Sequence, residues 1–289
     1  MSPAQSVWPA PAKLNLFLHI LGRRADGYHE LQTCFQFVDL CDEITIHVRK
    51  DGEIRRVVEI PGVPEDQDLC VRAARALRQA AGSPLGADIS LRKRIPIGGG
   101  LGGGSSDAAT CLVALNRLWG IDWPPDKLAA LGLKLGADVP VFVQGRAAWA
   151  EGVGERLTPL YPPLAPQETN YLILKPNVSV STAHVFQDPD LTRNSPPITI
   201  HGFLASGGRN DCLGVVRRRY PEVAHALDWL SLFGSARLTG TGACVFLACE
   251  TMDLGQEIMH KLPAGIDGFL ARGLNDSPLL VRLHTGELG

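Results

Sequence analysis

The sequence lacks the features of several protein classes. Its 289 residues carry 28 Lys and Arg against 30 Asp and Glu, so no basic surplus points to nucleic acid as a partner. No apolar run approaches membrane-spanning length, and the first residues show no charged segment followed by an apolar one. The seven cysteines stand apart, without CxxC pairs or the Cys/His spacing of zinc sites. We expect a cytoplasmic protein with reduced cysteines and with neither nucleic-acid nor membrane partners.

The chain is long enough for two ordinary domains, and its composition of 45% hydrophobic and 20% charged residues is that of a globular protein. Prolines gather between residues 158 and 170, where we place a boundary between domains 1–160 and 161–289. Beyond it, elements follow the order βαββαβ with inserted helices, which is the ferredoxin-like arrangement. The fold class is therefore α+β. Two placements of the last strand stay open, one in the second domain and one in which it returns to the first domain.

Hydrophobic periodicity predicts the individual elements. In the first domain we expect strands at 12–20, 31–48, 87–95 and 139–143, a helix at 68–81, and further helices beginning near 105 and 125. In the second domain we expect strands at 171–175, 235–239, 244–249 and 267–272, helices at 181–187, 210–219, 221–233 and 251–262, and a loop over 188–208.

Glycine is concentrated in one stretch: from Gly98 to Gly104 only Leu101 is not glycine. Each glycine has a conformational-entropy cost on ordering, so this density needs a reason. Without Cβ atoms, successive N–H groups can converge on phosphate oxygens. A helix capped by Ser105 or Ser106 would add its free N–H groups and its dipole. The stretch therefore indicates a nucleotide-phosphate loop, and a flexible hinge is the alternative.

The spacing of Gly98, Gly100 and Gly103 also matches the GxGxxG pattern of dinucleotide-binding folds. The preceding strand argues against that fold, because it carries basic residues at 92–94 where a first parallel strand is apolar. No Gly-Lys-Ser/Thr follows the glycines, so the lysine of a Walker A loop is missing and the cation must come from 92–94 or Lys13. A dinucleotide-dependent oxidoreductase and a non-catalytic nucleotide-binding module stay open as alternatives.

The strand at 12–20 alternates strictly, with Lys13 and Asn15 on the face opposite its aliphatic residues. Spacing alone favours a solvated face. The functional interpretation is a strand that presents an ammonium and an amide into a cleft. Asp138 lies just past a helix end, where a turn aspartate is the ordinary interpretation.

Three segments in order resemble motifs of the GHMP kinases, a family of galactokinase, homoserine kinase, mevalonate kinase and phosphomevalonate kinase: Pro11–Leu16, Pro96–Ser106 and Leu238–Phe246. Further segments resemble the members whose substrate is a cytidine diphosphate-linked polyol: Asp26–His29, Leu135–Pro140 and Glu151–Glu155. The resemblance implies a two-domain GHMP kinase fold with an N-terminal mixed α/β nucleotide-binding domain. It also implies transfer of the ATP γ-phosphate to the 2-hydroxyl of a methylerythritol moiety, in the non-mevalonate route to isoprenoid precursors. Another GHMP kinase, for mevalonate, homoserine or a sugar, is the alternative.

The resemblance implies roles for single residues. Asp138 is the general base or orients the hydroxyl, and Lys13 pairs with it and faces the transferred phosphate. Asn15 and Thr182 contact the substrate, while the turn 240–242 lies against substrate and phosphate.

The cytosine ring, by the same resemblance, stacks between Tyr28 and Phe186, and His29 hydrogen-bonds its edge. The ATP-binding residues are Pro96, Ile97, Gly98, Gly99, Gly100, Leu101, Gly102, Gly103, Gly104, Ser105 and Ser106. Mg²⁺ travels with ATP. We assign it no protein ligand, and Ser106 is the one candidate, because the predicted helix after Asp107 shows no acidic residue as far as Trp119. We expect a monomer or a weak homodimer.

Overall fold

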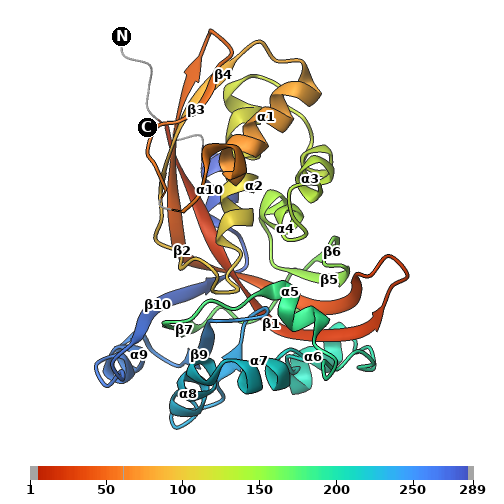
Figure 1. Cartoon of the computed structure of the whole chain (residues 1–289), viewed down its shortest axis with the longest axis vertical. Helices are drawn as coiled ribbons and strands as arrows, with labels where there is room; N and C mark the ends of the chain where they lie inside the picture. The colour runs from red at the N-terminus through yellow and green to blue at the C-terminus, as the bar shows by residue number, and fades with distance from the viewer. Residues whose placement is uncertain (1–5, 61, 286–289) are drawn as a thin grey trace.

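The computed structural model describes residues 6–60 and 62–285, and Figure 1 labels its elements. The strands are β1 (Ser6–Arg23), β2 (His29–Arg49), β3 (Ile54–Arg56), β4 (Gly86–Arg92), β5 (Ala148–Gly152), β6 (Arg156–Pro159), β7 (Asn170–Pro176), β8 (Arg237–Leu238), β9 (Val245–Cys249) and β10 (Ile266–Leu274). The helices are α1 (Leu69–Ala81), α2 (Gly103–Leu118), α3 (Pro125–Leu133), α4 (Val139–Gln144), α5 (Thr182–Gln187), α6 (Ile200–Ser206), α7 (Leu213–Arg219), α8 (Pro221–Leu230), α9 (Met252–Met259) and α10 (Pro278–Thr285). A short 3₁₀ helix spans Glu65–Gln67.

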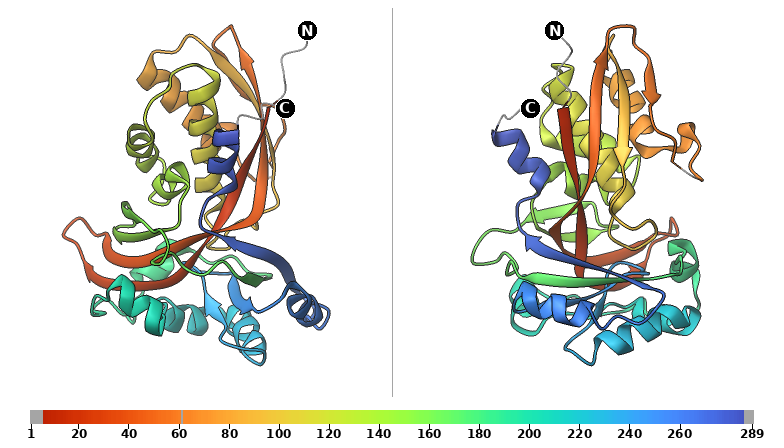
Figure 2. Two further views of the ribbon diagram at one scale, coloured as in Figure 1. Left: turned by 180° about the vertical axis from the view of Figure 1, so that it is seen from behind. Right: turned by 90° about the vertical axis from the view of Figure 1, so that its left-hand side faces the viewer.

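One long antiparallel pair, β1 with β2, runs through both halves of the molecule (Figures 1 and 2). The alternating pattern at 12–20 becomes a strand, as predicted, but both of its faces are buried. Lys13 and Asn15 are each only 3% exposed, so the expectation of a solvated face from spacing alone is wrong. The second face is buried because helices of the first half and a turn of the second half close over it.

The first half packs α1 to α4 and α10 together on one side of the sheet (Figure 2). Helix α2 lies closest, since small residues such as Ala108, Ala109 and Ala114 let its backbone approach β1 and α1. Strands β4 and β5 each pair with β2, β3 pairs with β4, and β6 with β5. This half carries the glycine loop, at the junction between β4 and α2.

The second half confirms the ferredoxin-like arrangement. Its strands lie in the order β10-β7-β9-β8 and all pair antiparallel. Helices α8 and α9 pack against this sheet, with Val223, Leu227 and Ile258 in the shared core. Strand β10 continues past β7 to pair with β2, through Gly273 and Leu274, before α10 contacts β1. The returning last strand joins the two sheets into one; the boundary at 160/161 stays a prediction.

Two of the predicted elements are wrong, and four observed elements have no predicted counterpart. Residues 139–143 form helix α4, not a strand, because all five side chains are buried and an unbroken apolar run does not distinguish the two. Pro140 occupies the first turn of this helix, where its missing N–H has no cost. Helix α6 lies inside the predicted loop 188–208, with its Thr199 cap side chain accepting from Gly202 N. The sequence patterns predict no element at β3, β5, β6 or α10.

Candidate active site

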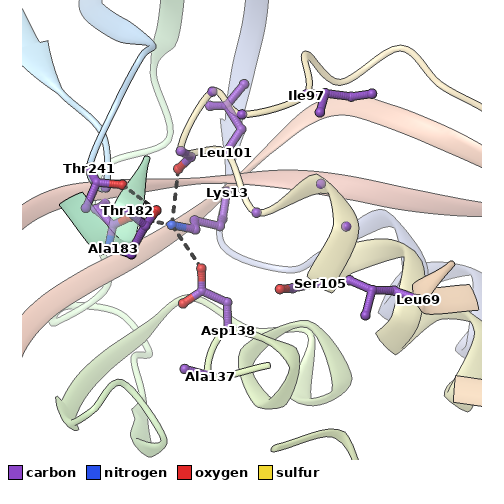
Figure 3. A pocket seen from close by; sticks show the side chains of 18 of the residues that line it. Lys13, Leu69, Ile97, Leu101, Ser105, Ala137, Asp138, Thr182, Ala183 and Thr241 are labelled. Carbon is purple, nitrogen blue, oxygen red and sulfur yellow. Dashed lines mark hydrogen bonds and ion pairs between the residues drawn. The ribbon is translucent and has the colours of Figure 1, made fainter. Parts of the chain in front are cut away.

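A cleft of about 1020 Å³ lies where the two halves meet. Its walls are β1, the glycine loop, the start of α4, helix α5 and the turn after β8, and Figure 3 shows them from close by. The predicted site residues line this cleft, with the exception of Ser106, of Gly242 in the turn 240–242, and of Arg92 and Arg94 among the candidate cations at 92–94. Segments far apart in the sequence therefore converge on one site.

The centre of the cleft is an ion pair between Lys13 and Asp138, with Nζ 3.3 Å from Oδ2 (Figure 3). The ammonium also donates to the Gly100 carbonyl at 3.2 Å and to Oδ1 of Asn15. The Lys13 side chain is 4% exposed, whereas that of Asp138 is 33% exposed. The Asp138 carboxylate therefore faces the cleft, while the Lys13 ammonium that pairs with it is buried.

Asp138 is the residue just before α4, with backbone angles already helical. Its side chain makes no capping hydrogen bond, so the carboxylate is left to face Lys13. Asn15 is held from both sides: its amide nitrogen donates to Thr33 Oγ1 at 3.0 Å, and its backbone N–H donates to Thr239 Oγ1 at 3.0 Å. Contacts among β1, the start of α4 and the turn after β8 therefore hold Lys13, Asn15 and Asp138 in place.

The glycine loop is packed tightly against the turn that follows β8. Ala243 N donates to Gly98 O at 3.1 Å, and Cys244 N donates to Gly99 O at 3.0 Å. A Cβ at Gly100 would lie 2.4 Å from the Thr239 carbonyl oxygen, and Gly100 has a φ of +75°. Some of the loop glycines are therefore needed because the backbones of the two halves contact each other here.

The far end of the loop opens onto helix α2. This helix begins at Gly103, its N-cap is Gly102 with φ +73°, and no side chain caps it. The expectation that Ser105 or Ser106 caps the helix is wrong, because the observed cap, Gly102, lies three residues before Ser105. The first N–H groups of α2 have no intrahelical partner and, with the dipole, favour an anion.

Ser105 lines the cleft, whereas Ser106 is fully buried and its Oγ has no partner in the described part of the chain. Among the described residues no group of three or more His, Cys, Asp or Glu is placed to hold a metal ion. Ser105, Asp107 and Asp138 are among the oxygen-bearing residues that line the cleft.

Lys93, Asp42 and Asp107 form a cluster beside the loop, in which both carboxyl groups are buried and the Lys93 side chain is 22% exposed. Lys93 Nζ lies 2.5 Å from an oxygen of Asp42 and 2.8 Å from an oxygen of Asp107. Asp42 also accepts from the backbone N–H groups of Arg94 and Ile95, so it anchors the strand that leads into the loop. Burial raises the pKa of Asp107 to about 8, against the lowering effect of Lys93. Its Oδ1 has no partner among the described residues.

The predicted base-binding residues lie together at one end of the cleft. The rings of His29 and Phe186 stack, with centroids 5.1 Å apart, and Tyr28 beside them is 64% exposed. Thr182 and Thr241 share a hydrogen bond of 2.9 Å across the cleft (Figure 3). With Tyr28 exposed next to the stacked rings of His29 and Phe186, this end of the cleft can bind a planar aromatic ring by stacking.

The other end of the cleft is apolar, and of its apolar residues only Ile97 was among the predicted site residues. Ile60, Val63, Leu69, Leu91 and Ile97 line it next to the glycine loop. Apart from Ile97, which lies in the Pro96–Ser106 motif, these residues share no period or motif, and only the fold brings them together. Such a surface suits the base of a nucleotide whose phosphates lie on the loop.

No described helix is both long and apolar enough to pass through a bilayer.

Comparisons with known proteins agree with this geometry. The family model for the GHMP kinase N-terminal domain matches residues 68–146, and the model for the GHMP kinase C-terminal domain matches residues 199–267. A 4-diphosphocytidyl-2-C-methyl-D-erythritol kinase of Pseudomonas syringae pv. syringae is 58% identical over 284 residues, covering 98% of this chain and 99% of that protein. One of Pseudomonas fluorescens is 55% identical over 285 residues, covering 99% of each.

Solved structures show the same fold. A crystal structure of 4-(cytidine 5'-diphospho)-2C-methyl-D-erythritol kinase matches with a TM-score of 0.79 at 34% identity, covering 92% of this chain and 98% of that one. A mevalonate kinase structure at 17% identity, with a TM-score of 0.69, covers 93% of this chain and 99% of that one and shares the fold alone. The chain therefore belongs to the GHMP kinase family and, within it, to the 4-diphosphocytidyl-2-C-methyl-D-erythritol kinases.

Proposed function

We propose that the cleft transfers the γ-phosphate of ATP to the 2-hydroxyl of 4-diphosphocytidyl-2-C-methyl-D-erythritol, with Lys13 and Asp138 at the reacting atoms. The observation that carries this proposal is the Lys13–Asp138 pair, 3.3 Å apart, beside the glycine loop. As a member of its family the chain is an ATP-dependent kinase of the non-mevalonate isoprenoid pathway. Its fold disfavours the dinucleotide-dependent alternative, because its sheet is largely antiparallel.

Phosphoryl transfer depends mainly on positioning and on charge stabilisation. The glycine loop and the first N–H groups of α2 hold the phosphates. Asp138 accepts a hydrogen bond from the acceptor hydroxyl and takes its proton as the oxygen–phosphorus bond forms and the bond to ADP breaks. Lys13 pairs with that carboxylate and offsets the charge that spreads over the transferred group. Asn15 holds the Lys13 ammonium in place and offers its amide to the substrate.

Mg²⁺ enters with ATP, and its chemistry is to neutralise charge on the phosphate oxygens. The described residues fit a metal held mainly by phosphate, because oxygens of Ser105 and Asp138 line the cleft without forming a closed cage. Ser106 is less suited than Ser105, since its hydroxyl is buried away from the cleft.

The substrate's cytosine lies between Tyr28 and Phe186, with its edge on His29. Adenine of ATP lies at the opposite, apolar end, against Ile60, Leu69 and Ile97. Two bases at opposite ends place both phosphate chains toward the loop and the Lys13–Asp138 pair at the centre. A cytoplasmic enzyme with reduced cysteines, six of the seven buried, stays our prediction.

The test is the Asp138→Asn variant, assayed by ADP release with ATP, Mg²⁺ and the cytidyl substrate. We expect kcat to fall by a factor of about 10³ or more, because the proton acceptor is lost, while ATP binding changes little. Asp126→Asn is the control, since Asp126 is exposed on α3 and does not line the cleft. Turnover at the wild-type rate in Asp138→Asn would remove Asp138 from the reaction.

A further inference from the structure

Arg193 is an unusual arginine at the base-binding end, in the segment between α5 and α6. It forms no ion pair in residues 6–60 and 62–285, and all of its hydrogen bonds go to uncharged acceptors. Its Nε donates to His29 Nε2 at 3.0 Å, and one Nη donates to the carbonyls of Phe186 at 2.9 Å and of Asp188 at 2.7 Å. A single guanidinium therefore joins β2 of the first half to the end of α5 in the second.

This contact determines where the proton of His29 resides. A guanidinium has only donors and stays protonated, so the ring nitrogen that faces it must carry the lone pair. His29 is then neutral and bears its proton on Nδ1. Its pKa is lowered, first by burial and then by the charges of Arg193 and Arg23, which agrees with the neutral ring.

The remaining ring nitrogen of His29 is free to meet a ligand. His29 lines the cleft, and within the described residues no group hydrogen-bonds its Nδ1. A neutral Nδ1–H donates and does not accept. In cytosine the ring atom N3 carries a lone pair, whereas in uracil N3 carries a proton. A fixed donor therefore favours the first base and rejects the second.

We propose that Arg193 is a positioning residue that fixes the Nδ1–H tautomer of His29 and thereby gives the site its preference for cytosine over uracil. This inference rests on the proposed function, since it takes the base end of the cleft to hold the cytidyl group. Arg193 does not touch the base in this account. It acts through His29, and through the Phe186 carbonyl it sets the distance between the two stacked rings.

The guanidinium is itself held rigidly. The Asp188 side chain is 1% exposed and is bound by Arg218 Nη2 at 2.7 Å and by Arg219. These two arginines are in the last turn of α7, so the segment 186–193 is tied to that helix. A rigid support is what a tautomer-selecting contact requires, because a mobile donor would not hold one ring orientation.

The first test reads the tautomer without substrate. In ¹⁵N-histidine-labelled protein, we expect His29 of the wild type to show a protonated Nδ1 and an unprotonated Nε2. Arg193→Met should populate the other tautomer or the protonated ring. Arg193→Lys keeps the charge but cannot reach His29 and both carbonyls together, so it should be intermediate. An unchanged His29 signature in Arg193→Met overturns the proposal.

The second test reads selectivity. Against the cytidyl substrate and its uridyl analogue, Arg193→Met should raise KM for the cytidyl compound about tenfold or more and narrow the cytosine preference, with KM for ATP nearly unchanged. Arg217→Met, on the exposed Arg217–Asp228 pair, is the control for loss of an arginine.

A double mutant separates positioning from general support. His29→Asn places an amide donor near the Nδ1 position and has no tautomers, so adding Arg193→Met should have little further effect on base preference. An equal loss of preference in both backgrounds would mean that Arg193 acts only as a structural support, which contradicts the proposal. Failure of the proposed function would be seen separately, as wild-type protein that does not turn over the cytidyl substrate while its His29 tautomer is as expected.

Discussion

Two buried side chains have pKa values shifted in opposite directions from their ordinary values. Asp107, beside Lys93 behind the glycine loop, has its pKa raised to about 8 by burial. His19 on β1 has its pKa lowered, first by burial and then by Arg209, against the raising effect of Asp211. Both groups are nearly inaccessible, at 3% and 4% exposure. The two residues should therefore give the folding free energy opposite slopes with pH.

Asp107 makes the protein less stable as pH rises. A carboxyl whose folded pKa is raised binds its proton more tightly in the folded chain, so its contribution is full below about pH 4 and is lost as pH approaches about 8. The Asp107→Asn variant does not titrate. We expect its stability relative to wild type to increase between pH 5 and about pH 8, measured by urea unfolding at each pH. A pH-independent difference would contradict the buried, titrating carboxyl.

His19 makes the protein less stable as pH falls. Both of its ring nitrogens are buried without a partner in the described structure, and a lowered folded pKa means that the unfolded chain takes up the proton first. Its contribution is present above the ordinary value of 6.5 and is lost below it. His19→Leu should therefore remove part of the stability loss between about pH 6.5 and pH 5 in urea unfolding. An acid slope as steep as that of wild type would exclude His19 as its source.

At the scale of elements, the contact between the glycine loop and the turn after β8 connects the two halves. Gly98, Gly99 and Gly100 face the backbone of residues 239–244, and Asn210 holds that turn by donating to the carbonyls of Leu238 at 3.0 Å and Gly240 at 2.8 Å. Lys13 donates from its backbone N–H to Leu101 O at 3.0 Å on the other side. The loop is therefore a shared wall of the cleft, not a free hinge.

Gly100→Ala tests this contact. A Cβ there meets backbone oxygens at 2.4 and 2.9 Å, so the two segments must separate. We expect a loss of roughly 3 kcal/mol or more of stability, together with loss of activity. Gly120→Ala is the matched control, because its φ of +65° imposes the same backbone strain while a Cβ there meets nothing within 4 Å. It should lose only about 1 kcal/mol in thermal unfolding. Equal losses in the two variants would show that only backbone strain matters.

Elements with clear periodicity could be predicted from the sequence. The strict alternation at 12–20 and the helical stripe of α2 are local patterns, and each formed the expected element. The apolar run in α4 lacks a period that separates strand from helix, so it was predicted wrongly. The helix start at Gly103 was missed because serines are good caps in general, whereas here tertiary contacts of the loop decide the start.

The site residues that lie in recognisable sequence motifs could be predicted. Lys13, Asp138 and the glycine loop lie in segments with recognisable residues, and the structure brings them together. The burial of Lys13 could not be predicted, because it depends on what packs against the second face of β1. Arg193 and the apolar cleft residues other than Ile97 have no local signal. Their place in the site depends on contacts between residues far apart in the sequence, such as the hydrogen bond between Arg193 and His29.

At the scale of the whole molecule, one continuous sheet supports a cleft that both halves build. Strand β10 pairs with β7 and then with β2, so the second half is bonded to the strand pair that carries Lys13, Asn15 and His29. The base end of the cleft needs Phe186 from one half and His29 from the other. The site is therefore a property of the complete chain, and neither half contains it alone.

Identification of the product decides whether this cleft phosphorylates a cytidyl polyol. Purified protein with ATP and Mg²⁺ is offered the cytidyl substrate, mevalonate, homoserine and galactose; ADP release is measured, and ³¹P NMR locates the new phosphate. We expect turnover with the cytidyl substrate alone and a phosphate ester on its 2-hydroxyl. Turnover of mevalonate, homoserine or galactose without the cytidyl compound, or a phosphate on another hydroxyl, would contradict it.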